Sequence, residues 1–153
     1  MYLLDTWIPL EYLLDQAKAD EVEKLLLRAS EIPMCITEFS LYSIGINVLR
    51  QKLAGRFIEF ADDVLTAGRL RLLRLGAPDM AAVAESARRL RFDFDDAHQY
   101  VAAEKHNLTL VSCDADFDRT DRGRKTPAEL LEEPPIARDR PPTETARRRT
   151  RKP

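Results

Sequence analysis

The sequence predicts an α/β protein built as one domain, in which a parallel sheet is covered by helices on both faces. Short apolar runs with the composition of buried strands alternate with longer segments of helical periodicity. This alternation is typical of parallel sheets, because each strand returns to the same edge through a right-handed crossover helix. Acidic residues stand at the ends of three of these runs, which places acids along one edge of the predicted sheet.

The chain of 153 residues is 44% hydrophobic, which is enough for one well-buried core and too short for two ordinary domains. We assign residues 1–133 to this domain and residues 134–153 to a basic, Pro- and Arg-rich tail that is expected to be disordered. The tail carries seven Lys and Arg against two acids, a net charge of +5, whereas the domain carries 17 against 24, a net charge of −7. The tail is therefore either an arm that contacts nucleic acid or a solubilising appendage.

The sequence contains no apolar segment of membrane-spanning length, and its first residues lack the basic region of a secretory leader. A soluble cytoplasmic protein with no membrane partner is therefore expected. Cys35 and Cys113 lie in separate predicted strands and lack CxxC or Cys/His spacing. We expect buried free thiols rather than a disulfide framework or a zinc site.

The first predicted strand is the N-terminal segment MYLLDT, which reaches Asp5 where the strand should end. Pro9 can open a first helix, and the apolar positions of residues 22–29 give a second helix one buried face. The segment PMCIT predicts the next strand. Glu38 follows it directly and therefore occupies a second junction between a strand and a helix.

Helical periodicity continues over residues 42–53, and Gly55 is expected to end that helix. A fourth helix is predicted from residue 57 to Gly68. The segment LRLLRL is short and apolar enough for a third strand, and residues 80–90 repeat apolar side chains at the spacing of a fifth helix.

The most acidic part of the domain combines the next helix with the last strand. Residues 94–106 have the periodicity of an amphipathic helix, for which Asp93 is a natural N-cap. LTLVS then predicts a buried strand with Asp114 just past its carboxyl end. After a polar, basic loop, the capping box that begins at Thr126 starts a short last helix.

Four carboxylates that are distant in sequence are thus expected to converge: Asp5, Glu38 and Asp114 at strand ends, and Asp96 in the first turn of a helix. Such a cluster is unfavourable without a cation, because like charges a few ångströms apart repel. Mg²⁺ or Mn²⁺ bound by oxygen ligands would offset this repulsion. Such ions polarise a phosphodiester and lower the pKa of an attacking water, so no side-chain nucleophile is needed.

These segments resemble a known family. LLDT at Asp5, ITEFSL at Glu38, DDAHQYVAAEKHNLTLVSCDADF at Asp96 and Asp114, and the closing KTPAELL together look like a PIN domain, and most of all like the VapC-type toxins of bacterial and archaeal toxin–antitoxin pairs. The resemblance covers nearly the whole domain. It implies a three-layer α/β/α sandwich around the parallel sheet.

The resemblance also implies an activity, partners and a set of site residues. It implies a metal-dependent endoribonuclease that uses Mg²⁺ or Mn²⁺ to cut structured RNA such as tRNA or rRNA, and a homodimer neutralised by an antitoxin. The catalytic and metal-binding residues would be Asp5, Glu38, Asp96 and Asp114, with Asp116 as a further possible metal ligand.

Two departures from the family pattern lie beside these acids. Trp7 stands where the family usually has a small or amide residue, and it either narrows the site or anchors a partner. Ser112 replaces the usual Thr, and together with Thr6 it can still orient the carboxylates by hydrogen bonding. The basic loop after the site either holds RNA phosphates or is simply solvated; its cations are Arg119, Arg122, Arg124 and Lys125.

Less specific interpretations stay open for several residues. Asp93 and Asp95 suit a helix start and are interpreted as capping or solvated residues. Neither histidine, His98 or His106, is placed in the catalytic set. Two other functions also stay open: a PIN-like RNA-binding or regulatory protein with weak or no nuclease activity, and an aspartate-based phosphatase or receiver domain, against which Trp7 argues.

Overall fold

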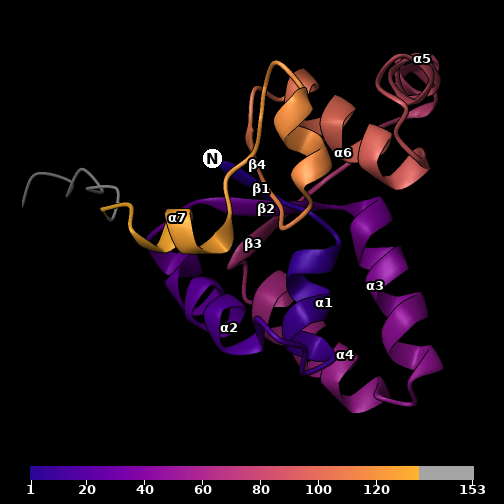
Figure 1. Ribbon diagram of the computed structural model, residues 1–153. Helices are drawn as coiled ribbons and strands as arrows, with labels where there is room; N and C mark the ends of the chain where they lie inside the picture. The colour runs from indigo at the N-terminus through magenta and orange to yellow at the C-terminus, as the bar shows by residue number, and fades with distance from the viewer. Residues whose placement is uncertain (135–153) are drawn as a thin grey trace, which may run out of the picture.

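The computed structural model describes residues 1–134, apart from the side chains of residues 63–65, so nearly all of the predicted tail lies outside the described residues (Figure 1). Its centre is a sheet of four parallel strands in the order β3-β2-β1-β4. The strands are β1 (Tyr2–Leu4), β2 (Met34–Thr37), β3 (Leu70–Leu73) and β4 (Thr109–Val111). All four predicted strands and their parallel arrangement are confirmed.

The two central strands bring distant parts of the chain to one edge of the sheet. Leu3 of β1 is in register with Cys35 of β2 on one side and with Leu110 of β4 on the other. Lys125 then forms an isolated parallel bridge with Val111 beyond β4. Because all strands run the same way, the residues that follow β1, β2 and β4 emerge together.

Alternation along the strands divides the core into two clusters. Leu4, Ile36 and Val111 face one cluster, whereas their neighbours Leu3 and Cys35 face the other. This is the period of two expected when both faces of a sheet are covered. The apolar strand residues therefore need helices on both sides.

Figure 1 shows the two helical layers. One layer, drawn below the sheet, holds five helices: α1 (Trp7–Leu13), α2 (Ala19–Leu27), α3 (Glu38–Arg50), α4 (Ala54–Phe60) and α7 (Pro127–Leu131). The other layer holds α5 (Met80–Leu90) and α6 (Phe94–Lys105). Short turns of 3-10 helix cover Arg28–Ser30, Ala77–Asp79 and Ala115–Arg119, and a π-helical turn covers Ala61–Thr66. The three-layer α/β/α architecture is confirmed.

Two helix boundaries differ from the prediction. The helix α1 begins at Trp7, so Pro9 lies inside its first turn, where the missing N–H of proline needs no acceptor. Gly55 does not end α3 but lies in α4. The break is made by Lys52, whose left-handed φ of 60° turns the chain after α3.

The helix α6 is more deeply buried than its sequence periodicity suggests. Its start is as predicted, because the Asp93 side chain accepts a hydrogen bond from the Asp96 N–H at 2.9 Å. Every residue from Ala97 to Ala103 is buried, however, because α6 lies between the sheet and α5. More of the α6 surface is therefore buried than the single apolar face that the sequence predicted.

The two cysteines lie at different depths in the fold. Both cysteines are free; Cys35 is buried in β2, whereas Cys113 is only half-buried and lies just past β4 rather than within it. Within residues 1–134, no helix has the length and apolar composition needed to cross a membrane.

Candidate active site

Asp5 is the most deeply buried of the predicted acids, with 2% of its surface exposed. It follows β1 directly, and its N–H donates to the carbonyl of Val111 at 2.9 Å, so the sheet itself fixes its backbone. Burial raises the pKa of Asp5 to about 6, and the charges of Asp95 and Asp114 also raise it, against the lowering effect of Ser112.

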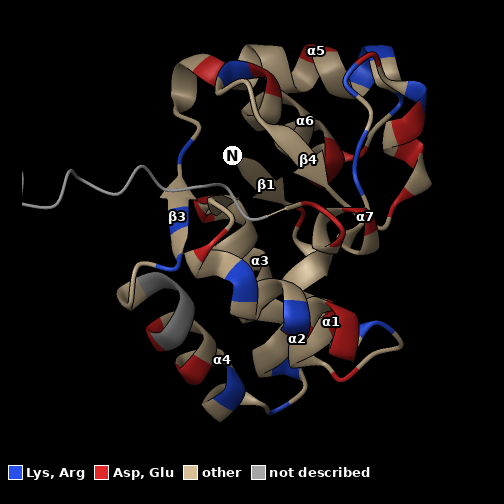
Figure 2. Cartoon of the chain, turned by 90° about the vertical axis from the view of Figure 1, so that its left-hand side faces the viewer, with Lys and Arg blue, Asp and Glu red and all other residues tan. Residues whose placement is uncertain are grey.

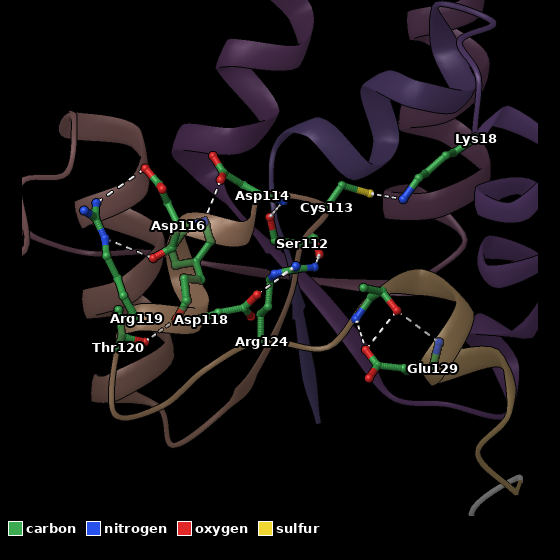
Figure 3. A network of polar contacts seen from close by, with 12 residues as sticks. Lys18, Ser112, Cys113, Asp114, Asp116, Asp118, Arg119, Thr120, Arg124 and Glu129 are labelled. Carbon is green, nitrogen blue, oxygen red and sulfur yellow. Dashed lines mark hydrogen bonds and ion pairs between the residues drawn. The ribbon is translucent and has the colours of Figure 1, made fainter.

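Ser112 connects the two acids that follow β1 and β4. Its hydroxyl donates to Asp5 Oδ2 at 2.7 Å and accepts from the Asp114 N–H at 2.9 Å. Asp114 Oδ1 in turn accepts from the Asp116 N–H at 2.8 Å (Figure 3). The Ser112 hydroxyl therefore links Asp5 to the turn that carries Asp114.

Asp96 reaches the same place from the first turn of α6. It is half-buried, and burial raises its pKa to about 7, with further contributions from Asp93, Asp5, Asp114 and Asp95 in that order. The structure therefore brings Asp5, Asp96 and Asp114 close enough for their charges to act on one another. In the absence of a cation, this arrangement stores electrostatic repulsion.

Asp95 is a fourth acid in this group, and its interpretation as a capping or solvated residue is wrong. It is half-buried, and Thr6 Oγ1 donates to its Oδ1 at 3.1 Å. Burial raises the pKa of Asp95, and hydrogen bonds from Thr6 and Gln99 oppose this rise. Its charge also raises the pKa of Asp5.

A buried polar network lies behind Asp95. The Gln99 amide nitrogen donates to Thr6 Oγ1 at 3.0 Å and to Ser40 Oγ at 2.6 Å, and Ser40 also hydrogen bonds to Thr37 at 2.9 Å. All four side chains are buried. Ser40 and Gln99 were not predicted from the sequence. Each is a polar residue within a helix whose neighbouring positions are apolar, and this pattern could have indicated a buried polar contact.

Glu38 lies at the end of β2 as predicted, but it is paired rather than joined to the other acids. Its Oε2 is 3.4 Å from Nε of Arg74, the residue directly after β3. The Arg74 side chain is 75% exposed and that of Glu38 is 32% exposed. Arg74 was also missed, although a cation that follows an edge strand could have been expected at the same end of the sheet.

The donor set fits a hard divalent cation, although the ligands are not already assembled. In the part of the chain that the structure describes, no three His, Cys, Asp or Glu side chains stand close enough together to hold an ion as they are. Asp5, Asp96 and Asp114 nevertheless present only oxygen atoms and carry uncompensated repulsion. Asp116 does not face this group, because its Oδ2 lies 3.4 Å from Nη2 of Arg119.

The predicted cations of the loop after the site are engaged in local contacts. Arg124 pairs with Asp118 at 3.0 Å and donates to the Ser112 carbonyl at 3.0 Å (Figure 3). Arg122 donates to the Leu108 carbonyl at 3.0 Å, and Lys125 pairs with Glu133. Arg119 lies over the ring of Phe92 at 5.0 Å and pairs with Asp116. Figure 2 shows acidic and basic residues mixed over both helical layers rather than one broad basic face.

Comparison with known proteins now identifies the family. Residues 2–123, from β1 through the loop after β4, match the family model described as PIN domain. The chain belongs to the PIN-domain family. The match includes all four predicted acids, and PIN domains are generally nucleases. No curated protein matches the sequence.

Solved structures agree with this fold. VapBC2 from Rickettsia felis bound to a DNA fragment from their promoter is 19% identical, with a TM-score of 0.63 over 82% of this chain and 96% of that chain. A toxin–antitoxin complex from Klebsiella pneumoniae is 15% identical, with a TM-score of 0.62 over 83% and 98%. FitAcB from Neisseria gonorrhoeae is 19% identical, with a TM-score of 0.59 over 85% and 100%. At these identities the similarity shows the fold alone.

Proposed function

We propose that this PIN domain is a divalent-metal-dependent endoribonuclease of the VapC type and acts as the toxin of a cytoplasmic toxin–antitoxin pair. The observation that carries the proposal is the convergence of Asp5, Asp96 and Asp114 on one edge of the sheet, with the pKa of Asp5 and of Asp96 raised by burial and mutual repulsion. Such a group of carboxylates would favour a hard cation, which suits the hydrolysis of a phosphodiester.

The side chains of the site divide the work. Asp5, Asp96 and Asp114 would hold Mg²⁺ or Mn²⁺, while hydrogen bonds from Ser112 to Asp5 and from Thr6 to the neighbouring Asp95 keep these carboxylates in place. When bound, the ion would polarise the phosphodiester and lower the pKa of the attacking water. Glu38 is proposed as a fourth catalytic acid, for which it must leave Arg74, and Asp116 as a further ligand.

The basic loop is proposed to contact the RNA backbone outside the reacting phosphate. Arg119 and Arg122 are exposed and can exchange their present contacts for phosphates. Arg124 and Lys125 are more enclosed, and their side chains are 13% and 38% exposed. They would contribute mainly by holding the loop against β4.

The activity test is cleavage of structured RNA by three proteins: wild type, Asp5→Asn and Asp62→Asn. Asp62 is an exposed acid after α4 and serves as the matched control. Wild type and the Asp62 variant should cleave with Mg²⁺ or Mn²⁺ and stop on addition of EDTA. Asp5→Asn should lose activity by orders of magnitude while it stays folded. EDTA-insensitive cleavage by Asp5→Asn would reject the proposal.

An antitoxin is the proposed protein partner, because two of the similar structures are described as toxin–antitoxin or VapBC assemblies. A pocket of about 320 Å³ lies between α1, α2 and α4. Leu13, Leu26 and Phe60 provide apolar walls, and its acids outnumber its arginines, which suits a basic amphipathic segment. Co-expression with an adjacent small reading frame should give a complex that resists separation.

A homodimer is proposed from the exposed apolar side chains of α3. Tyr42, Ile46 and Leu49 repeat at helical spacing and are 62%, 53% and 53% exposed. Side chains of this kind usually mark an interface. Light scattering at micromolar concentration should report a dimer, and Ile46→Glu should convert it to a monomer.

The second candidate function is RNA binding without cleavage. It is favoured by one observation, the Glu38–Arg74 ion pair, which withholds one acid from the group. RNA binding that is retained with Mg²⁺ or Mn²⁺ present but gives no cleavage product would support this function. Metal-dependent cleavage would exclude it.

A further inference from the structure

Three aromatic side chains from α3 and α6 pack together next in sequence to the acids Glu38 and Asp95, and we call Phe39, Phe94 and His98 the rim aromatics. The rings of Phe39 and Phe94 lie edge to face, with centroids 5.4 Å apart and an interplanar angle of 68°. His98 supports both, with centroids 5.0 Å from Phe39 and 6.1 Å from Phe94. The set therefore joins the first turns of α3 and α6.

The rim aromatics do not serve the hydrophobic core. Neither of the two core clusters includes any of the three side chains. His98 is buried and Phe39 is half-buried, but Phe94 is 52% exposed. The first turn of a helix needs no aromatic residue, since α6 is already capped by Asp93. The Phe94 ring is therefore fixed by contacts with Phe39 and His98 while about half of the residue stays exposed, which leaves the ring available to a ligand.

The position of this ring limits what can cover it. Phe39 directly follows Glu38, and Phe94 lies between Asp93 and Asp95. Without a bound cation, a phosphate against this ring would be repelled by the neighbouring acids, whereas an uncharged planar group would not. A second protein copy over Phe94 would also bury the exposed Asp93 carboxylate without a cation, which is unfavourable.

We propose that Phe94, supported by Phe39 and His98, stacks one base of the RNA next to the phosphodiester held at the carboxylates. The proposal rests on the proposed ribonuclease function and adds a base-binding subsite to it. Stacking of a base on an aromatic ring is tolerant of sequence and does not depend on charge. Stacking would therefore attract RNA to an acidic site without a long-range electrostatic contribution.

The test measures binding of a fluorescently labelled single-stranded oligoribonucleotide of about twelve nucleotides to the non-cleaving Asp5→Asn protein. Phe94→Ala in this background should weaken binding about tenfold, because aromatic stacking contributes that much per base. Phe94→Trp should restore binding, and the slope of affinity against salt should not change, because every phosphate contact remains. Ile58→Ala is the matched control, since Ile58 is an equally exposed apolar residue on α4.

An abasic scan of the oligonucleotide assigns the effect to one base. At one position of the oligonucleotide, removal of the base should weaken binding to the protein that keeps Phe94. At that position the affinities of the Phe94 and Phe94→Ala proteins should become equal. Equal affinities for Phe94 and Phe94→Ala, or a difference that persists at every abasic position, would overturn the subsite while leaving the ribonuclease proposal intact. Conversion of a dimer to a monomer by Phe94→Ala would instead assign the ring to a protein interface. If no form of the protein binds RNA, both proposals fail.

Discussion

The acidic edge of the sheet has two halves that solve the problem of buried negative charge differently. In the half formed by β1, β4 and α6, Asp5 and Asp96 have raised pKa values and no cationic partner supplied by the described part of the chain. In the half formed by β2 and β3, Glu38 is more exposed and pairs with Arg74. Only the first half therefore lacks a partner cation among the described residues.

This difference predicts where each kind of substitution acts. Acids of the β1–β4–α6 half, which we call the unpaired half, should control metal binding and the pH dependence of stability. Residues of the β2–β3 half, the paired half, should affect activity with little influence on either property.

The largest effect is expected for cleavage after substitution of Asp96. Asp96→Asn replaces a negatively charged ligand of the unpaired half with a neutral one. The rate constant of RNA cleavage should fall on the order of a thousandfold, because metal-ion stabilisation of the transition state is worth several kcal/mol. Arg74→Ala in the paired half should change the same rate less than about tenfold. Single-turnover cleavage rates measure both, and equal losses would remove the distinction between the halves.

The next effect concerns stability of the metal-free protein against pH. The pKa of Asp5 is about 6 in the folded protein against an ordinary value of 3.8, so the folded state binds the extra proton between these values. The contribution of Asp5 to the free energy of unfolding should therefore be highest at low pH and fall by about 3 kcal/mol as pH rises from 3.8 to 6, of which about 2 kcal/mol lies above pH 4.5. Urea titrations from pH 4.5 to 7.5 measure the fall. Asp5→Asn should remove this part of the fall and leave the part due to Asp96, whose pKa is about 7, and Glu38→Gln should leave the whole fall unchanged.

Much of this arrangement follows from local sequence, and the rest does not. Asp5 and Glu38 could be placed because an apolar run predicts a strand and the next residue marks its end. Asp93 could be placed because N-capping is a local interaction, and the structure shows its hydrogen bond to Asp96.

The partners of the acids could not be predicted, because they depend on packing between distant elements. Thr6 meets Asp95 across 89 residues, and Gln99 meets Thr6 across 93. The pairing of Glu38 with Arg74 depends on β2 and β3 being neighbours in the sheet. Sequence periodicity assigns a residue to a helix face but does not say which strand end that face will meet.

A smaller effect is expected from Ser112, which belongs to the unpaired half. Ser112→Ala removes the hydroxyl that donates to Asp5 and accepts from the Asp114 N–H, and it should lower the free energy of unfolding by about 1–3 kcal/mol. It should also raise the pKa of Asp5 further. Ser112→Thr keeps the hydroxyl and should restore most of the stability. Thermal unfolding of the three proteins decides this, and equal stability of the Ala and Thr variants would contradict the role of the hydroxyl.

The smallest effect is expected from the basic tail, which belongs to neither half. Truncation after Glu133 should weaken RNA binding and lower the log-log salt slope by about 0.7 for each phosphate that the tail would otherwise bind. The cleavage site should stay the same. RNA affinities of the full-length and truncated proteins are measured at several salt concentrations. Equal salt slopes for the two proteins would identify the tail as a solvated appendage. A moved cleavage site would mean that the tail selects sequence.

Titration of Mn²⁺ into the metal-free protein, with the heat of binding measured by calorimetry, tests whether the unpaired half is a site for a divalent cation. At pH 7.5, wild type and the control Asp62→Asn should bind Mn²⁺ with equal affinity, and Asp5→Asn should bind at least about tenfold more weakly. The wild-type affinity should fall as pH is lowered from 8 to 6, because protons compete for Asp5 and Asp96, whose pKa values are about 6 and about 7. Binding by Asp5→Asn at the wild-type affinity, or an affinity that does not change with pH, would contradict the claim.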